Sequence, residues 1–499
     1  MNDPNNIAES LFYKNEKDAL SGLYGIYDAY QATDLMGTHF NGLNSISDDL
    51  ANNNSNDGFR AFELSTQDPF TNPRVINFYV HFYNVINRAC YVISRVEEMN
   101  DQQITVSVRK RIIAESSFLR NYAYFILTDL YRDIPFYKTP QNISSGLLST
   151  TLRKDIIAFL KQDLIAQIPN LPISITASEK GRVGRGAAIT LLGQLYLYDN
   201  EYQNAEATLK PLLSAPYNYS LFQDYSKLFT PAGEFSTESI FEINFDGTGA
   251  DKGVNANNNL IINGSGFSEV LDTLLQPYKP KNNLTPASKL VDSYLCIDGK
   301  PIANSTVYGV KSPLYATTNS QTKFDVRDPR LKATVFTASD NLPSGKKLWN
   351  WTNLNSYAVR KYVEITSTQY PSGPQNFYVY RFADVLLMYA EAQNEILASP
   401  DATVYDAVNK IRRRVGMPDY PINLSKDQMR ERIRDERRWE FGLEYHRYFD
   451  LKRWGIIQTA IVNSGIAQKK FTNPRDYVWP IPQRELDVNA NMVQAAEWR

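Results

Sequence analysis

The pattern that most restricts the fold of this chain is a helix–turn–helix signature within residues 181–216. Leu192-Gly193 is followed by Tyr196 and then by Ala205, which is the spacing of a helix-pair repeat of about 34 residues. The glycine and the alanine allow two antiparallel helices to approach closely, and the tyrosine ring fills the space beside them. Pro216 follows near the position where such a repeat ends. The segment therefore predicts a tight helical hairpin.

A looser copy of this signature occupies residues 386–418, with a longer turn between its two helices. Apolar residues also recur at helical spacing in several other parts of the chain. Two copies among further helices favour a body of stacked helix pairs, which offers surfaces to partners and seldom performs chemistry. The residues that fit the second copy are Leu387, Ala390, Ala392, Ala407, Ile411 and Pro418, and the other expected helices cover residues 1–35, 76–99, 105–131, 151–168, 380–397, 402–415, 425–443 and 450–462.

The middle of the chain has a different character. Within residues 216–380 the helical periodicity fades, and Gly, Pro, Asn, Ser and Thr become frequent, while residues 239–245 alternate as a strand does. We therefore expect a mainly α fold, in which a tetratricopeptide-like helix-pair scaffold carries an irregular lobe with short strands. Residues 1–215 and 381–499 would form the scaffold, and residues 216–380 would form the lobe. Because binding usually sits on loops held by a rigid scaffold, the lobe is expected to bind the ligand.

A second polar stretch lies earlier, at residues 37–58, and it is rich in Asn and Asp. Such a composition is typical of turns and loops. The sequence predicts a long loop here that buries no core face.

Charge and residue usage exclude several classes of protein. The formal net charge of -1 gives no basic face for nucleic acid. No apolar run reaches the length of a membrane-spanning helix, and the first residues lack the features of a signal peptide. The two cysteines, Cys90 and Cys296, and three histidines form no metal-binding or redox motif, so we expect no metal and no cofactor. Whether the two cysteines form a disulfide is left open by the sequence.

No catalytic motif is present. Glu436, Glu440 and Glu444 are spaced to share one helix face, among the arginines Arg434, Arg437, Arg438 and Arg447. Glycoside hydrolysis needs two carboxyl groups, one of them with a raised pKa, whereas neighbouring arginines lower the pKa of a carboxyl group. Together with the surrounding aromatic rings, these residues favour a rigid structural cluster of ion pairs. We therefore expect no enzymatic activity.

A glycine- and arginine-rich segment, residues 181–186, precedes the first helical hairpin. A phosphate cradle is conceivable there, but the segment does not follow an expected strand. The favoured interpretation is that these residues begin the helix and let it pack closely.

The C-terminal motifs resemble those of the SusD/RagB family. Residues 436–441 read Glu-Arg-Arg-Trp-Glu-Phe, and residues 447–454 read Arg-Tyr-Phe-Asp-Leu-Lys-Arg-Trp, as the family signature does. Further matching segments are residues 114–135, 184–188, 380–392 and 479–482. The resemblance spans residues 7–494.

This resemblance implies a surface-exposed lipoprotein of the outer membrane in a Bacteroidetes-type bacterium. It would bind a ligand and deliver it to a TonB-dependent SusC-like transporter. The ligand is usually an oligosaccharide, and the alternative is a peptide, as for RagB-like proteins. The family carries its lipid on an N-terminal cysteine, and because no cysteine precedes Cys90, the resemblance places that cysteine in a leader outside this sequence.

The candidate ligand contacts lie in three regions that the family uses. Sugars are recognised by flat aromatic rings together with Asn, Asp or Arg side chains for the hydroxyl groups. On an alternating strand, Trp349 and Trp351 would point to one side and form a platform, although at least one of them could instead pack inside the lobe. The full candidate set is Asn44, Asp48, Asp68, Arg74, Tyr79, Tyr278, Tyr315, Trp349 and Trp351.

Overall fold

The computed structural model describes residues 12–37, 39–53, 57–141, 147–245, 284–307, 322–337, 340, 357–362 and 375–499. Helices dominate these residues, and the strands are short and occur in pairs. The predicted mainly α fold is therefore confirmed. No helix in the described ranges combines the length and the apolar character needed to cross a membrane.

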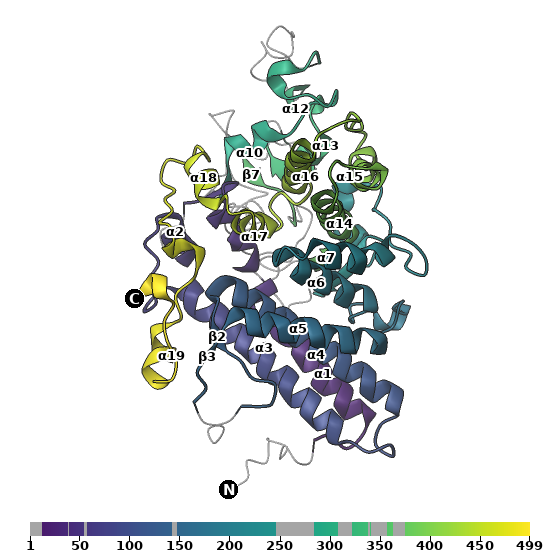
Figure 1. Cartoon of the computed structure of the whole chain (residues 1–499), viewed down its shortest axis with the longest axis vertical. Coiled ribbons are helices and arrows are strands. Elements are labelled where there is room, and N and C mark those ends of the chain that lie inside the picture. Colours follow the sequence, from purple (N-terminus) through teal and green to yellow (C-terminus); the bar gives the residue numbers. More distant parts are fainter. Residues whose placement is uncertain are drawn as a thin grey trace, which may run out of the picture.

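Four long helices from the N-terminal part lie in the lower half of the molecule in Figure 1. They are α1 (Glu16–Tyr30), α3 (Pro73–Glu98), α4 (Val106–Tyr131) and α5 (Arg153–Gln167). The two longest, α3 and α4, have 26 residues each and pack on one another, while α1 lies against both and α5 covers α4. Asn72 fixes the start of α3, because its side chain accepts hydrogen bonds from two backbone N–H groups of the first turn.

The predicted hairpin consists of α6 (Arg185–Tyr198) and α7 (Tyr202–Leu209). At their contact, a Cβ atom on Gly193 would lie 2.5 Å from the Leu209 side chain, so only glycine allows this approach. Ala205 is fully buried. The predicted close approach is confirmed; the tetratricopeptide-like nature of the pairs stays a prediction.

The helical stack continues from α7 to a helix much later in the chain. α7 packs on α14 (Phe382–Ile396), which in turn contacts α15 (Ala402–Arg414) and α16 (Lys426–Glu440). Figure 1 shows this stack rising from α5 through α6, α7 and α14. The division at residues 215 and 380 stays a prediction, and this packing supports it.

The intervening sequence contributes short strands and helices. The predicted strand is confirmed as β4 (Ser239–Ile243), which pairs antiparallel with β8 (Phe377–Arg381). The helix expected from residue 380 begins at Phe382 instead, because Tyr380 and Arg381 belong to β8. The intervening sequence also contains β5 (Leu284–Pro286), the pair β6 (Val335–Phe336) and β7 (Ala358–Val359), and the helices α10 (Ser288–Ser293), α12 (Thr322–Asp325) and α13 (Pro329–Thr334). β5 pairs with β1 (Leu50–Asn52) of the N-terminal part, where β2 (Ile134–Pro135) also pairs with β3 (Thr150–Thr151).

The early polar stretch is not the loop that its composition predicted. It contains a 3-10 helix, His39–Ile46, then β1, and it leads into α2 (Gly58–Glu63). Phe40 and Leu43 are completely buried in the main core, so the prediction that this stretch buries no core face was wrong. Its polar side chains enter the interior because arginines from the C-terminal part pair with them, as described below.

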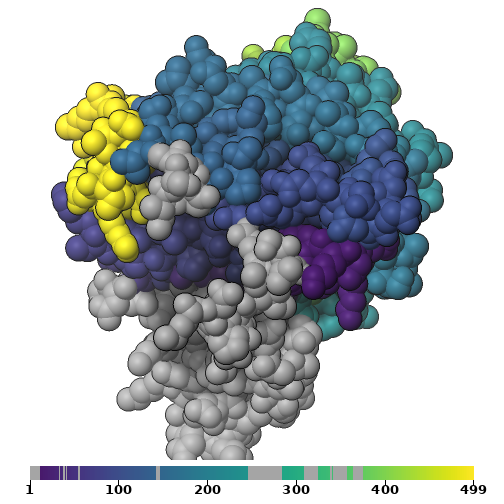
Figure 2. Space-filling model, turned by 90° about the horizontal axis from the view of Figure 1, so that it is seen from below, coloured from purple at the N-terminus to yellow at the C-terminus, as the bar shows by residue number. Residues whose placement is uncertain are grey.

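The C-terminal part differs from its prediction in the ends of its helices. α16 stops at Glu440, and two short helices, α17 (His446–Arg453) and α18 (Ile457–Val462), replace the single helix expected at residues 450–462. Gly455 separates them in a left-handed conformation, with φ of 69°. The final segment with α19 (Gln483–Val488) lies beside the N-terminal helices, as Figure 2 shows in yellow, and the backbone N–H of Gln483 donates to the carbonyl of Pro69.

Candidate functional site

The predicted cluster of glutamates is a buried ion network. Glu436, Glu440 and Glu444 are 0 %, 0 % and 2 % exposed. The sequence predicted that the neighbouring arginines Arg434, Arg437, Arg438 and Arg447 would pair with these glutamates. In the structure, the basic partners come from other elements instead. These contacts join Arg330 to Glu436 at 2.6 Å and to Glu440 at 3.2 Å, Arg412 to Glu436 at 3.1 Å, Arg414 to Glu440 at 2.5 Å, and Arg381 and Lys361 to Glu444 at 2.8 Å each.

This environment keeps the central carboxylate ionised. Burial on its own would raise the pKa of Glu440, but Arg414, Arg381 and Arg330 together hold that pKa below its usual range. A general acid needs the opposite shift. The network is therefore suited to joining helices and strands, and the predicted structural role is confirmed for these three glutamates.

Two of the predicted ligand contacts tie the early segment to the family signature. The Arg447 guanidinium donates to both oxygens of Asp48, at 2.8 and 2.9 Å, and Arg438 donates to Asp49 at 2.7 Å. Asn44 accepts a hydrogen bond from the backbone N–H of Tyr445 at 2.8 Å. Because Asn44 and Asp48 are only 3 % and 5 % exposed, their polar atoms serve the scaffold in this structure.

Three further candidates surround the start of α3. The Asp68 carboxylate accepts from the backbone N–H groups of Phe70 and Thr71, at 2.8 and 2.7 Å, and it is the only one of the five described candidates that is not buried. Arg74 pairs with Asp57 and Asp34 at 3.1 Å each. Tyr79 is 3 % exposed, and burial raises the pKa of its hydroxyl.

The remaining four candidates are Tyr278, Tyr315, Trp349 and Trp351. They lie outside the described residues. The platform that Trp349 and Trp351 would form stays a prediction.

The cysteines and histidines give no indication of redox or metal chemistry in the described part of the chain. Cys90 and Cys296 are both buried and are not joined in a disulfide. Among the described residues, no group of three or more His, Cys, Asp or Glu side chains is arranged to hold a metal ion.

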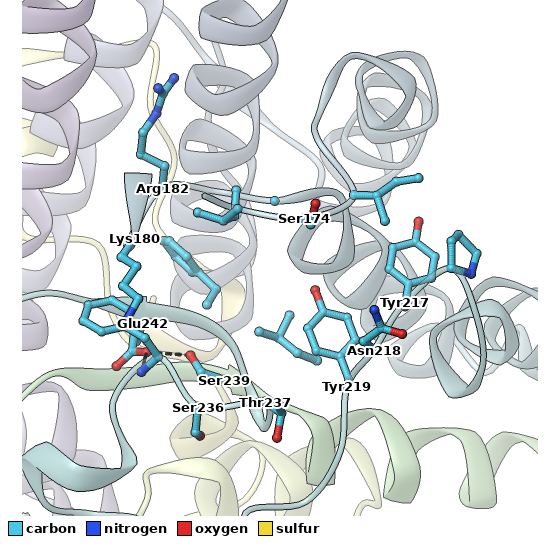
Figure 3. A pocket seen from close by; sticks show the side chains of 18 residues that line it. Ser174, Lys180, Arg182, Tyr217, Asn218, Tyr219, Ser236, Thr237, Ser239 and Glu242 are labelled. Carbon is cyan, nitrogen blue, oxygen red and sulfur yellow. Dashed lines mark hydrogen bonds between the residues drawn. The ribbon is translucent and has the colours of Figure 1, made fainter. Parts of the chain in front are cut away.

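A cavity that the sequence did not predict lies elsewhere, between residues 173–184, 216–219 and 235–242, and has a volume of about 240 Å³. Figure 3 shows tyrosine rings on one side of it and a lysine and a glutamate on the other. The glycine-rich segment forms part of its wall. There Gly181 has a φ of +90°, and a Cβ atom on it would lie 1.9 Å from the Asn244 amide. The interpretation that this segment begins a helix is confirmed, because α6 starts at Arg185 directly after Gly184.

Two family models together match most of the chain. The model described as the SusD family matches residues 237–498, and the model described as starch-binding associating with outer membrane matches residues 15–197. The first alone covers more than half of the chain. The chain therefore belongs to the SusD family, and the resemblance of its C-terminal motifs is confirmed.

Individual relatives align along nearly the whole chain. SusD-like protein P25 of Formosa agariphila is 25% identical over 98% of this chain and 93% of its own length. A solved structure described as a laminarin binding SusD-like protein is 25% identical, with a TM-score of 0.75 over 97% of this chain and 100% of that one. A SusD-like protein from Bacteroides fragilis is 20% identical, with a TM-score of 0.80 over 98% of each chain, and it supports the fold alone.

Proposed function

We propose that this protein binds an oligosaccharide or polysaccharide at the cell surface and delivers it to a TonB-dependent SusC-like transporter in the outer membrane, without chemical turnover. The observation that carries the proposal is the full-length similarity to a laminarin binding SusD-like protein. The family model for starch-binding proteins associated with the outer membrane supports the location. A lipid anchor, which the family resemblance implies, would hold the protein there.

The chemistry of the described carboxyl groups supports binding without turnover. The glutamates of the signature are clamped by arginines, as shown above. Burial raises the pKa of Glu234 to about 7 and also raises the pKa of Glu242. Only Glu242 lines the cavity of Figure 3, whereas a glycosidase needs two carboxyl groups facing the same sugar bond.

A binding screen tests the proposal. The purified protein would be run through native gels containing laminarin, starch, xylan or host glycans, and the positive polysaccharides would be titrated by calorimetry. Retarded migration in at least one gel is expected, with no release of reducing ends. Binding of peptides with no retardation by any polysaccharide would replace the proposal by the RagB-like alternative, and release of reducing ends would contradict the absence of turnover.

The proposed tryptophan platform has its own variants. If Trp349 and Trp351 stack on sugar rings, replacing either one by alanine should weaken binding by about 1–3 kcal/mol, a scale taken from aromatic stacking on nucleic-acid bases. Tyr24→Ala is the control, because Tyr24 is an aromatic residue of α1 that is 49 % exposed and far from the lobe in sequence. Equal affinity of both tryptophan variants and the control would remove the platform from the proposal.

A further inference from the structure

The cavity of Figure 3 is formed by three segments that are separate in sequence. The connector before α6, the stretch after Pro216 and the start of β4 with the residues before it each supply one wall. None of the five described candidates for glycan contact, Asn44, Asp48, Asp68, Arg74 and Tyr79, lines it. The lining of this cavity therefore differs from the described candidate contacts of the proposed function.

One wall is aromatic and held in place. The rings of Tyr217 and Tyr219 are nearly parallel, with an interplanar angle of 9° and centroids 6.1 Å apart. Tyr219 also stacks on Phe382 at 6.2 Å. Its hydroxyl occupies the space above Gly186, where a Cβ atom would lie only 2.1 Å away. Figure 3 shows the two tyrosine hydroxyls pointing the same way. These contacts fix the rings before any ligand arrives, which lowers the entropic cost of binding.

The opposite wall carries a buried carboxylate that is only half satisfied. Oε1 of Glu242 accepts hydrogen bonds from the backbone N–H of Phe235 at 2.7 Å and from the Ser239 hydroxyl at 2.6 Å. Oε2 makes no hydrogen bond to the described residues, although the side chain is 1 % exposed. Burial raises the pKa of Glu242, and the hydrogen bonds from Ser239 and Phe235, followed by the Asn376 amide and the Lys180 ammonium, partly oppose this shift. A buried acceptor without a full set of partners favours a ligand that donates hydrogen bonds.

Neutral polar groups complete the lining. Ser174, Asn218 and Thr237 are exposed at the mouth of the cavity. The Ser236 hydroxyl is buried and has no hydrogen-bond partner among the described residues. The Lys180 ammonium lies 5.2 Å from the centre of the Phe235 ring, and this cation–π contact stabilises part of its positive charge. The lining therefore offers many neutral hydrogen-bonding groups and little uncompensated charge.

A sugar ring matches this combination. Its apolar face packs on tyrosine rings, and its hydroxyl groups both donate and accept hydrogen bonds. The volume of about 240 Å³ is smaller than the sites that bind drug-sized molecules, so it suits one sugar unit and not a chain. A purely apolar ligand would leave the buried Glu242 oxygen without a hydrogen-bond donor, which is unfavourable.

We propose that this cavity is a second carbohydrate site, which binds a single neutral sugar unit between Tyr217, Tyr219 and Glu242. The residues that define this site differ from the two tryptophans of the proposed platform, so variants can test the two separately. It would engage either the end of a longer chain or a free sugar.

Saturation-transfer NMR with the methyl glycosides of glucose, mannose, galactose and xylose tests the site. The measurements would use the full chain carrying Trp349→Ala and Trp351→Ala, so that the proposed platform does not contribute. At least one glycoside at millimolar concentration is expected to show transfer. Ser174→Trp should abolish it, because Ser174 is exposed on the cavity wall and the larger ring would fill the space.

Ser178→Trp is the matched control, because Ser178 is exposed on the same connector and does not line the cavity. Glu242→Gln should weaken glycoside binding by about tenfold, the equivalent of one hydrogen bond to a charged group. Thermal unfolding of each variant would show that the fold is kept. No transfer from any glycoside, or equal transfer in Ser174→Trp and Ser178→Trp, would overturn the proposal.

The native gels separate this proposal from the proposed function. Ser174→Trp in the otherwise unchanged chain should still be retarded by the polysaccharide that binds the platform. Loss of gel retardation by Trp349→Ala and Trp351→Ala with intact glycoside transfer would support two separate sites. Glycoside transfer without any polysaccharide retardation would refute the proposed function and leave the second site standing.

Discussion

Replacing Glu440 by glutamine should destabilise the protein by about 3–5 kcal/mol, the usual cost of removing one partner from a buried ion network. The carboxylate is completely buried and contacts Arg330, Arg381 and Arg414. Glutamine keeps the shape of the side chain but removes one negative charge that the three guanidinium groups share, and their remaining partners, among them Glu436, Glu238 and Glu444, do not replace it. Since domains are usually stable by about 5–15 kcal/mol, the loss should be large and measurable by urea unfolding followed by tryptophan fluorescence.

The same helix provides the control. Glu431 pairs with Arg434 at 2.9 Å, but its side chain is 64 % exposed. Glu431→Gln should therefore change the free energy of unfolding by less than about 1 kcal/mol, because solvent screens a surface ion pair. An equal loss of stability in Glu440→Gln and Glu431→Gln would contradict the stabilising role of the buried ion network.

The direction of the pKa shift predicts how the difference depends on pH. The folded pKa of Glu440 lies below its unfolded value, so the stabilisation is present in full above the unfolded pKa, near 4.5. It is lost as the pH falls through the folded pKa. The stability difference between wild type and Glu440→Gln should therefore shrink in acid, and a constant difference between neutral pH and pH of about 3 would contradict the ionised state assigned to Glu440.

Two further variants test how the scaffold is joined. Arg447→Ala removes both hydrogen bonds to the buried Asp48 carboxylate and should cost about 3–5 kcal/mol, with faster proteolysis at residues 39–52; unchanged cleavage there would show that the early segment is held by other contacts. Gly193→Ala places a Cβ atom 2.5 Å from the Leu209 side chain and should cost about 1–3 kcal/mol through overpacking. Gly25→Ala, where the nearest atom would be 3.9 Å away, should be neutral or stabilising, and an equal loss in both would rule out helix contact as the cause.

Periodicity in the sequence predicted most of the scaffold correctly. Helices appeared close to the expected places for α3, α4 and α6: α3 buries one regular apolar face, whereas α4 and α6 are rich in apolar residues and are buried along most of their length on every side. The strand at β4 was recognised by its alternation. These features depend on neighbouring residues and are therefore visible in a single sequence.

The failures have a common physical cause, which is contact between distant parts of the chain. Nothing local at Asp48 shows that Arg447 will neutralise it, so an Asn- and Asp-rich stretch was taken for a surface loop. Arg381 was expected within a helix, whereas it ends a strand whose partner is β4. The cavity was missed because its Tyr217 and Glu242 walls look ordinary until the fold brings them together.

The packing of α7 on α14 also bears on how such proteins can diversify. α7 touches α14, and β4 pairs with β8. The sequence between these elements therefore leaves the scaffold and re-enters it at neighbouring points. Closing a loop costs only about 0.6 kcal/mol more for each doubling of its length. Insertions or deletions between these anchors that keep Arg330 and Lys361, the two basic members of the buried ion network in this stretch, would therefore change the binding surface at little thermodynamic expense while the scaffold stays the same.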